Sequence, residues 1–269
     1  TMTEAPLRVA LLRSDSPHQL FLEAVLANRF DVPIVVIEPG SAQQARLRRI
    51  AGWSAWAWRG YQQCRSRITG RAARSRRWFA ERIPPMATVP PRRTVGWIND
   101  PVVGATLARH APDVTVVCGT TYLRAETLSV AGTVVNVHGG VLPWYRGNHG
   151  VFFAYAAGDF QRIGASLHLV SPVLDGGDLI EVVRPRMYPG DDAEVLYDRA
   201  VHDAALRLCE LLGARERGAD LPTFPQPPGV GRTYRHRDRT PGRELRLALR
   251  RWSSRHRVPE LPAAVESGT

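Results

Sequence analysis

The sequence predicts an α/β fold built around a doubly wound, mostly parallel sheet, and three observations support this fold class. Short apolar runs with the length of buried strands alternate with segments whose apolar residues recur at helical spacing. The connections between successive runs are long enough for the crossover helix that parallel strands require. Polar, glycine-containing turns follow several runs, at the strand ends where ligands bind in open parallel sheets.

The first two strands are expected at residues 7–12 and 32–37, because both runs are almost entirely apolar. Between them, the segment from Ser14 to Pro17 offers N-cap residues and a proline suited to the start of a helix. Residues 18–30 then carry apolar side chains at helical spacing. A strand, a helix and a strand in this order predict a parallel pair with a right-handed connection, the opening of a Rossmann-like sheet.

Residues 41–94 interrupt this pattern and predict a basic, Trp-rich helical insertion. Trp53, Trp56 and Trp58 are interleaved with alanines. A dense run of arginines follows them and includes Arg65, Arg67, Arg71, Arg74, Arg76 and Arg77. One interpretation is an amphipathic element that lies on a membrane surface or against a partner. The other, which we favour, is that the tryptophans pack on the core and the arginines are simply solvated.

The alternation of helices and strands resumes after the insertion. Apolar runs predict four more strands, at residues 114–118, 133–137, 165–170 and 179–183. Capping residues and helical spacing predict four helices, at residues 102–110, 125–130, 150–157 and 191–214. Beyond them the composition becomes rich in proline and then in arginine. We therefore expect a main domain over residues 1–218 and a Pro-rich linker with a basic C-terminal extension over residues 219–269.

Composition limits the classes of function that the chain can have. The net charge is +11, but all 36 basic residues are arginines, so the charge is a weak argument for a nucleic-acid partner. Cys64, Cys118 and Cys209 are scattered without a CxxC spacing, and no metal site is expected from them. No run reaches 18 apolar residues and the first residues do not resemble a signal peptide, so we expect a cytoplasmic protein.

Three polar residues at strand ends and in a turn suit acyl transfer. Asn136 and His138 lie at the carboxyl end of an expected strand, and Asp175 opens a tight Asp-Gly-Gly-Asp turn. An amide N–H and an imidazole N–H can stabilise the oxyanion that forms when an amine attacks a carbonyl. A carboxylate near the imidazole can orient it and take the amine proton. The residues alone leave two alternatives open, since Asn-X-His also occurs by chance and Asp-Gly-Gly is commonly a turn.

The run from Asn136 to Gly147, followed about forty residues later by the turn at Asp175, resembles the signature of the folate-dependent formyltransferases. Their catalytic domain is shared by glycinamide ribonucleotide, methionyl-tRNA and sugar-amine N-formyltransferases, and the resemblance covers residues 95–183 well. It implies N10-formyltetrahydrofolate as the formyl donor and direct transfer to an amine. Asn136 and His138 would polarise the formyl carbonyl, and Asp175 would handle protons together with His138.

The resemblance also implies a set of binding residues. Two loops would border the pterin ring largely through their backbone: Thr121, Tyr122, Leu123, Val170, Val173 and Leu174. Gly140 stands where the family often has a serine, and we expect it to open space near His138. Gly140, Arg146 and His149 are candidates for contact with the acceptor. His168, inside an expected strand, is interpreted as an interior histidine rather than a site residue.

The acceptor is expected to be the amine of a small molecule, such as an aminosugar nucleotide, an amino acid or a peptide, in glycan or specialised-metabolite biosynthesis. The segment after residue 219 is short for the C-terminal barrel of the tRNA enzymes, which disfavours nucleic acid. A homodimer and a membrane surface stay open as partners. Two alternatives remain: the same fold with another acyl or one-carbon donor, and a non-catalytic protein that binds a membrane or partner through its insertion.

Overall fold

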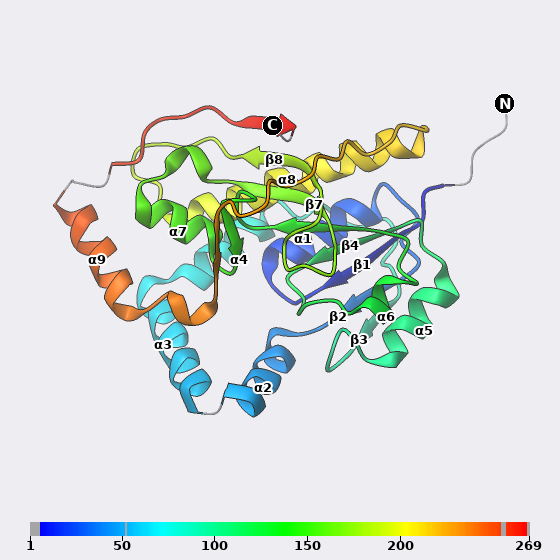
Figure 1. Ribbon diagram of the computed structural model, residues 1–269, viewed down its shortest axis with the longest axis horizontal. Helices are drawn as coiled ribbons and strands as arrows, with labels where there is room; N and C mark the ends of the chain where they lie inside the picture. The colour runs from blue at the N-terminus through cyan, green and yellow to red at the C-terminus, as the bar shows by residue number, and fades with distance from the viewer. Residues whose placement is uncertain (1–5, 52, 254–256, 268–269) are drawn as a thin grey trace. The chain divides into compact units, whose positions relative to one another are not determined.

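A computed structural model of the chain describes residues 6–51, 53–253 and 257–267 (Figure 1). The chain divides into two compact units. The first comprises Thr1–Ala55, Arg76–Val137 and Ala205–Pro222, and the second comprises Trp56–Ser75, His138–Ala204 and Thr223–Thr269. The side chains of residues 50–59 and 62 lie outside the description. The expected packing of Trp53, Trp56 and Trp58 therefore stays a prediction.

The sheet of the first unit consists of parallel strands in the order β5-β4-β1-β2-β3. Its strands are β1 (Val9–Arg13), β2 (Val35–Ile37), β3 (Arg92–Thr94), β4 (Val114–Cys118) and β5 (Thr133–His138). Every residue of β1 and β4 is buried, as expected for parallel strands covered on both faces. The predicted α/β class with a doubly wound, mostly parallel sheet is confirmed.

Four helices of this unit follow its strands, and two of them begin at capping residues. They are α1 (Pro17–Ala27), α2 (Gly40–Ala51), α5 (Pro101–His110) and α6 (Ala125–Leu128). Asp100 caps α5 by accepting a hydrogen bond from the backbone N–H of Val102, and a proline follows at the first helical position. Gln19 closes a capping box with Ser16 at the start of α1. Local signals therefore fix where α1 and α5 begin.

The second unit contains an antiparallel ladder in the order β10-β8-β7, formed by β7 (Ala165–Leu169), β8 (Leu179–Arg184) and β10 (Ala264–Ser267). A separate pair joins β6 (Tyr145–Gly147) to β9 (Arg232–Tyr234) in parallel. The strands β9 and β10 come from the segment that we expected to be an extension. The boundary near residue 218 stays a prediction, but the residues beyond it are integral to the second unit.

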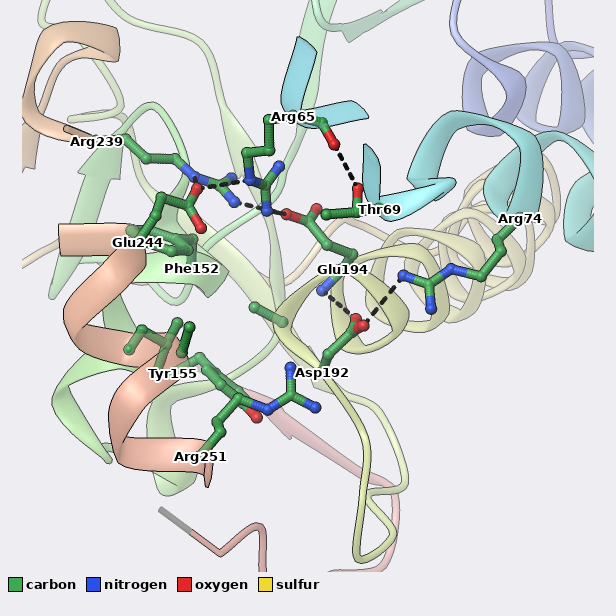
Figure 2. A pocket seen from close by; sticks show the side chains of 13 residues that line it. Arg65, Thr69, Arg74, Phe152, Tyr155, Asp192, Glu194, Arg239, Glu244 and Arg251 are labelled. Carbon is green, nitrogen blue, oxygen red and sulfur yellow. Dashed lines mark hydrogen bonds and ion pairs between the residues drawn. The ribbon is translucent and has the colours of Figure 1, made fainter. Parts of the chain in front are cut away.

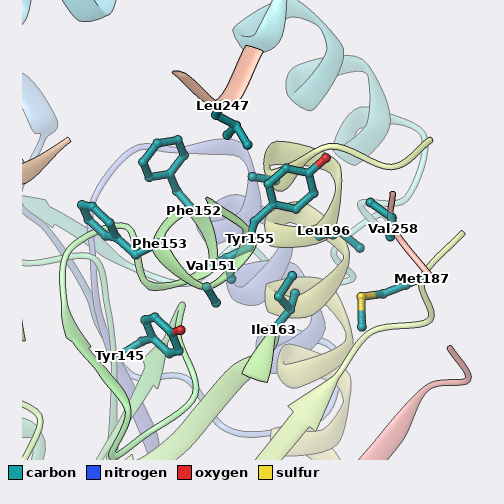
Figure 3. Close-up of a cluster of buried hydrophobic side chains, with 12 residues drawn as sticks. Tyr145, Val151, Phe152, Phe153, Tyr155, Ile163, Met187, Leu196, Leu247 and Val258 are labelled. Atoms are coloured by element: carbon teal, nitrogen blue, oxygen red, sulfur yellow. The ribbon is translucent and has the colours of Figure 1, made fainter. Parts of the chain in front are cut away.

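Helices surround an apolar core in the second unit. They are α7 (Gly150–Ala157), α9 (Pro241–Trp252) and parts of α3 (Trp53–Thr69), α4 (Arg71–Ala80) and α8 (Ala193–Glu216). Figure 3 shows aromatic side chains of α7 among residues of α8 and α9, such as Leu196 and Leu247. Within the described ranges, no helix combines the length and the apolar composition that a bilayer-spanning helix needs.

The arginines of the insertion differ from the expectation that they are simply solvated. Arg65 forms ion pairs with Glu194 and Glu244, and Arg71 pairs with Glu194 at 2.5 Å. Both guanidinium groups are largely buried by these contacts. The expectation was wrong for these two residues because their acidic partners lie more than a hundred residues away in the sequence, where no local pattern shows them.

Candidate functional site

Strand β5 carries Asn136 and His138 at its carboxyl end. Residues two apart on a strand project to the same face, so the Asn-X-His spacing gives both side chains one direction. His138 is buried, and its Nε2 lies 3.0 Å from the backbone oxygen of Tyr145. A carbonyl can only accept, so Nε2 carries the hydrogen in the neutral ring and Nδ1 presents a lone pair.

Asp175 lies beside the lone-pair side of His138. Its Oδ2 is 3.7 Å from Nδ1 of His138, which is longer than a hydrogen bond. The same oxygen accepts a hydrogen bond of 2.7 Å from the backbone N–H of Gly147. Asp175 adopts a left-handed backbone conformation with a φ of 49°, which aspartate tolerates better than most residues. The structure thus brings together His138 and Asp175, two of the three predicted catalytic residues, although they are 37 residues apart in the sequence.

His168 on β7 is a residue that the sequence argument assigned to the interior. It is buried, and its Nε2 also faces Asp175, at 3.8 Å from Oδ1. Its Nδ1 lies 2.8 Å from the carbonyl oxygen of Leu169 and therefore carries the hydrogen. Burial and the nearby ring of His138 lower the pKa of His168 to about 4, against the opposing charge of Asp175. In the sequence, the one available indication that His168 lies near the site was its position seven residues before Asp175.

The two imidazoles and the carboxylate form a cluster of proton acceptors. Both rings use one N–H on a backbone carbonyl, so the nitrogens that face Asp175 are acceptors in the neutral rings. Three acceptor groups facing one another repel unless one of them is protonated. The cluster is therefore suited to take up a proton released by a reacting amine.

Gly140 does not open space near His138, and this expectation is corrected. A Cβ atom at Gly140 would lie 2.7 Å from the backbone oxygen of Tyr145 and 2.9 Å from Nε2 of His138. The Cα atom of Gly150 would be 3.2 Å away. The space that a side chain would fill is already taken by the backbone that holds the imidazole. Glycine is required there by close packing rather than by room for an acceptor.

The turn after β4, expected to border the pterin, is held by internal hydrogen bonds. Thr121 donates its backbone N–H and its hydroxyl to the buried carboxylate of Glu38, at 2.7 and 2.9 Å. The carbonyl of Tyr122 accepts a hydrogen bond from Asn99, and the side chain of Leu123 is buried. These contacts fix the path of the turn. The role of its backbone toward a ligand stays a prediction.

The second expected pterin loop, residues 170–174, exposes apolar side chains. Val173 and Leu174 are both exposed, although they directly precede Asp175 in the chain. Val170 is half-buried at the end of β7. Exposed aliphatic side chains beside the carboxylate of Asp175 are suited to cover an apolar face of a ligand. Their assignment to the pterin also stays a prediction.

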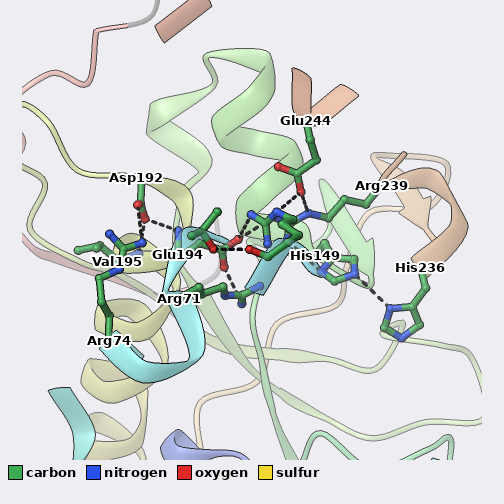
Figure 4. Close-up of polar contacts among 11 residues, drawn as sticks. Arg71, Arg74, His149, Asp192, Glu194, Val195, His236, Arg239 and Glu244 are labelled. Carbon is green, nitrogen blue, oxygen red and sulfur yellow. Dashed lines mark hydrogen bonds and ion pairs between the residues drawn. The ribbon is translucent and has the colours of Figure 1, made fainter. Parts of the chain in front are cut away.

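Arg146 and His149 are engaged by residues of the C-terminal segment. The guanidinium of Arg146 donates to the carbonyl of Val230 at 2.6 Å and to Gln226 at 3.4 Å. His149 contacts His236 at 3.1 Å and Arg239 at 3.4 Å, as Figure 4 shows. Burial and the charge of Arg239 lower the pKa of His149 well below its ordinary value, so the ring is neutral. Contact of either residue with an acceptor remains a prediction.

Gln226 is a residue near the site that sequence reasoning missed. Its side-chain N–H groups donate to the carbonyl oxygens of Asp175 at 2.9 Å and Gly177 at 2.6 Å. Its Oε1 accepts from Arg146, so one side chain ties the Asp175 turn to β6. Nothing in the local sequence marks it, because it lies in a Pro-rich stretch that predicts only a linker.

Comparison with known proteins identifies relatives with this fold. The family model described as formyl transferase matches residues 76–210. A methionyl-tRNA formyltransferase from Burkholderia ambifaria is 33% identical over 168 residues, which are 61% of this chain and 50% of the relative. A second one, from Burkholderia cenocepacia, is 36% identical over 100 residues, 37% of this chain and 30% of the relative. The chain thus spans half or less of the length of the curated relatives that it matches.

Solved structures share the fold at low sequence identity. Phosphoribosylglycinamide formyltransferase from Anaplasma phagocytophilum has a TM-score of 0.55 and 17% identity, covering 85% of this chain and 98% of that one. A sugar N-formyltransferase from Shewanella has a TM-score of 0.54 and 14% identity, covering 86% and 78%. These similarities concern the fold alone, whereas the family model includes both motifs of the site. The chain belongs to the formyl transferase family.

Proposed function

We propose that the chain transfers a formyl group from N10-formyltetrahydrofolate to an amine of a small molecule. The observation that carries this proposal is the cluster in which His138 and His168 face the carboxylate of Asp175, next to the strand position of Asn136. Membership of the formyl transferase family supports the donor and the reaction type. The acceptors that we propose are an aminosugar nucleotide, an amino acid or a peptide amine.

We propose that each of the two predicted loops contributes contacts to the folate. The exposed side chains of Val173 and Leu174 offer an apolar surface beside Asp175. The turn at Thr121 to Leu123 presents a backbone fixed by Glu38. When bound, the donor supplies the formyl group, and the remaining chemistry falls to side chains of this protein.

His138 can stabilise negative charge on the formyl oxygen only when Nδ1 carries a proton, because the Nε2 hydrogen is committed to Tyr145. The neutral ring would present a lone pair to that oxygen and repel it. The side-chain amide of Asn136 would donate to the same oxygen. The proposed mechanism therefore requires a proton on Nδ1 of His138 as the C–N bond to the amine forms, separate from the amine proton that Asp175 takes.

Asp175 would take the proton that the amine loses in that step. Its Oδ1 faces His168, whose low pKa keeps the second ring neutral near pH 7. Because His168 binds a proton only weakly, it does not compete with the carboxylate of Asp175 for the proton of the amine. The proton can then pass to the nitrogen that loses the formyl group, which balances the transfer.

Mass spectrometry of candidate amines incubated with the protein and the formyl donor tests this proposal. We expect a gain of one formyl unit on a small amine, and methionyl-tRNA belongs in the panel because curated relatives are named for it. His138→Ala and Asp175→Asn should each lower turnover by about 10²–10⁴-fold. Asp178→Asn is the matched control, since Asp178 is an exposed carboxylate in the same turn. Full activity of either catalytic variant would refute the mechanism.

A further inference from the structure

A cavity of about 180 Å³ lies in the second unit, and the residues around it carry more positive than negative charge. Figure 2 shows the charged side chains that converge on it from α3, α4, α8 and α9. Its lining includes four arginines, Arg65, Arg74, Arg239 and Arg251, against the three carboxylates of Asp192, Glu194 and Glu244. Leu247, Ala248 and aromatic residues of α7 supply the apolar part of the wall.

Two arginines and two glutamates of the lining form a closed ring of ion pairs. Arg65 pairs with Glu194 at 2.8 Å and with Glu244 at 2.9 Å. Arg239 pairs with the same two carboxylates, at 2.6 Å each. Burial raises the pKa of Glu194, but the charges of Arg71, Arg239 and Arg65 outweigh it and bring the pKa to about 2. Glu194 is therefore ionised, and both carboxylates are already paired with guanidinium groups.

The ring of ion pairs does not use every N–H donor of its arginines. Nη1 of Arg65 is buried and has no hydrogen-bond partner among the described residues. A buried N–H group without a partner is costly, so it is a site where an acceptor from outside would be stabilised. Nε and Nη2 of the same side chain are held by the two glutamates. The unpaired nitrogen is thus fixed in place by the contacts of its neighbours.

Two further guanidinium groups reach the cavity without being needed by the ring. Arg74 is more than half exposed, and its one ion pair among the described residues is with Asp192, at 3.2 Å. In the part of the chain that the structure describes, Arg251 has no ion-pair partner, and its nearest ring contact is Tyr155, with the guanidinium carbon 6.0 Å from the ring centroid. If the ion pairs served only to hold the helices together, neither Arg74 nor Arg251 would be needed at the cavity. Their approach to the same cavity favours an anionic occupant.

We propose that this cavity binds the phosphate group of a small molecule. Guanidinium groups recognise phosphate through paired N–H donors, and Arg65, Arg74 and Arg251 offer such donors around one space. All four arginines of the lining lie outside residues 76–210, so the part of the chain that matches the family does not supply the charge. The proposal does not depend on formyl transfer.

Isothermal titration calorimetry of the full chain with inorganic phosphate, pyrophosphate and acetate at constant ionic strength tests the site. We expect phosphate or pyrophosphate to bind with a Kd below about 1 mM, and acetate not to bind. Arg251→Gln and Arg74→Gln should each raise that Kd by about tenfold or more. Both residues are exposed on the rim, so these substitutions spare the buried ring. Arg65 is left intact because its loss would break the ring.

Arg246→Gln is the matched control, since Arg246 is exposed on the same helix and does not line the cavity. It removes one positive charge and should leave the Kd within about twofold of the parent protein. A Kd above about 1 mM for both phosphates would overturn the proposal. Comparable binding of acetate, or an equal loss in the Arg246 variant, would do so as well, because either result would indicate non-specific attraction to a basic protein.

Discussion

The tautomer of His138 is set by a backbone carbonyl rather than by the carboxylate of Asp175. Tyr145 accepts the Nε2 hydrogen, so the nitrogen that faces Asp175 changes from acceptor to donor when the ring gains a proton. In the proposed mechanism, this contact makes the ring with a proton on Nδ1 the reactive form. It depends in turn on how closely the chain at Gly140 approaches the imidazole.

Replacing Gly140 by alanine is expected to reduce both stability and activity. The new methyl group would sit 2.9 Å from Nε2 of His138 and displace the ring or the carbonyl that orients it. Overpacking of this kind costs about 1–3 kcal/mol. Urea denaturation and the formylation assay measure the two effects. Gly96→Ala is the control because a Cβ atom there meets no atom within 4 Å. Unchanged activity of Gly140→Ala would show that space is open at this position after all.

His168 should stay neutral in the folded protein down to about pH 4. Because this pKa is below the unfolded value near 6.5, the folded state binds fewer protons, and stability falls as the pH decreases from about 6.5 toward 4. NMR titration of the imidazole checks the pKa, with the urea-unfolded chain as the reference. Asp175→Asn should lower the pKa further, since the carboxylate favours the charged ring. A rise in that variant would contradict the arrangement of the cluster.

At the level of elements, the Asp175 turn is held from outside its own strand pair. Gln226 binds the backbone of the turn on one side and Arg146 of β6 on the other. The carboxylate therefore keeps its place opposite His138 through a residue fifty positions later in the chain. We infer that Gln226 positions Asp175 without touching a substrate.

Gln226→Ala is expected to lower kcat by about tenfold with a smaller change in KM, because the turn loses two hydrogen bonds near the reacting groups. Gln226→Asn tests whether side-chain length matters, since the shorter amide should not reach the same carbonyl oxygens and should recover little of the lost kcat. The steady-state assay reports kcat and KM separately. Gln161→Ala, at an exposed glutamine bonded to Arg184, serves as the control. A general loss of folded protein with an unaltered kcat would assign Gln226 a structural role instead.

For the whole molecule, apolar periodicity was enough to predict the central strands. The runs at residues 7–12, 114–118 and 133–137 became β1, β4 and β5, because strands buried on both faces leave a nearly continuous apolar record. The strands β9 and β10 were missed. They are three and four residues long and mostly exposed, so their pairing with β6 and β8 leaves no periodic signal.

The site was predictable only where its residues form a motif. Asn136, His138 and Asp175 have a spacing that resembles a known signature. Gln226 lies 51 residues after Asp175 and comes close to it only in the folded chain. His168 was visible in the sequence but was assigned to the interior, because an isolated histidine in an apolar strand is commonly a buried one. Long-range hydrogen bonds and ion pairs are the part of the structure that local patterns do not encode.

The segment after residue 222 is expected to contribute to the stability of the second unit rather than to be a loosely attached extension. Val258 is buried in the core that includes Leu196 and Met187, whereas Val265 on β10 is half exposed opposite Val183. Val258→Asp places a carboxylate in an apolar core and should lower the free energy of unfolding by about 3 kcal/mol or more. Val265→Asp adds the same charge at a solvated edge and should change it by less than about 1 kcal/mol. Urea denaturation distinguishes the two, and equal, small effects would mean that the segment is an appendage, as its composition suggested.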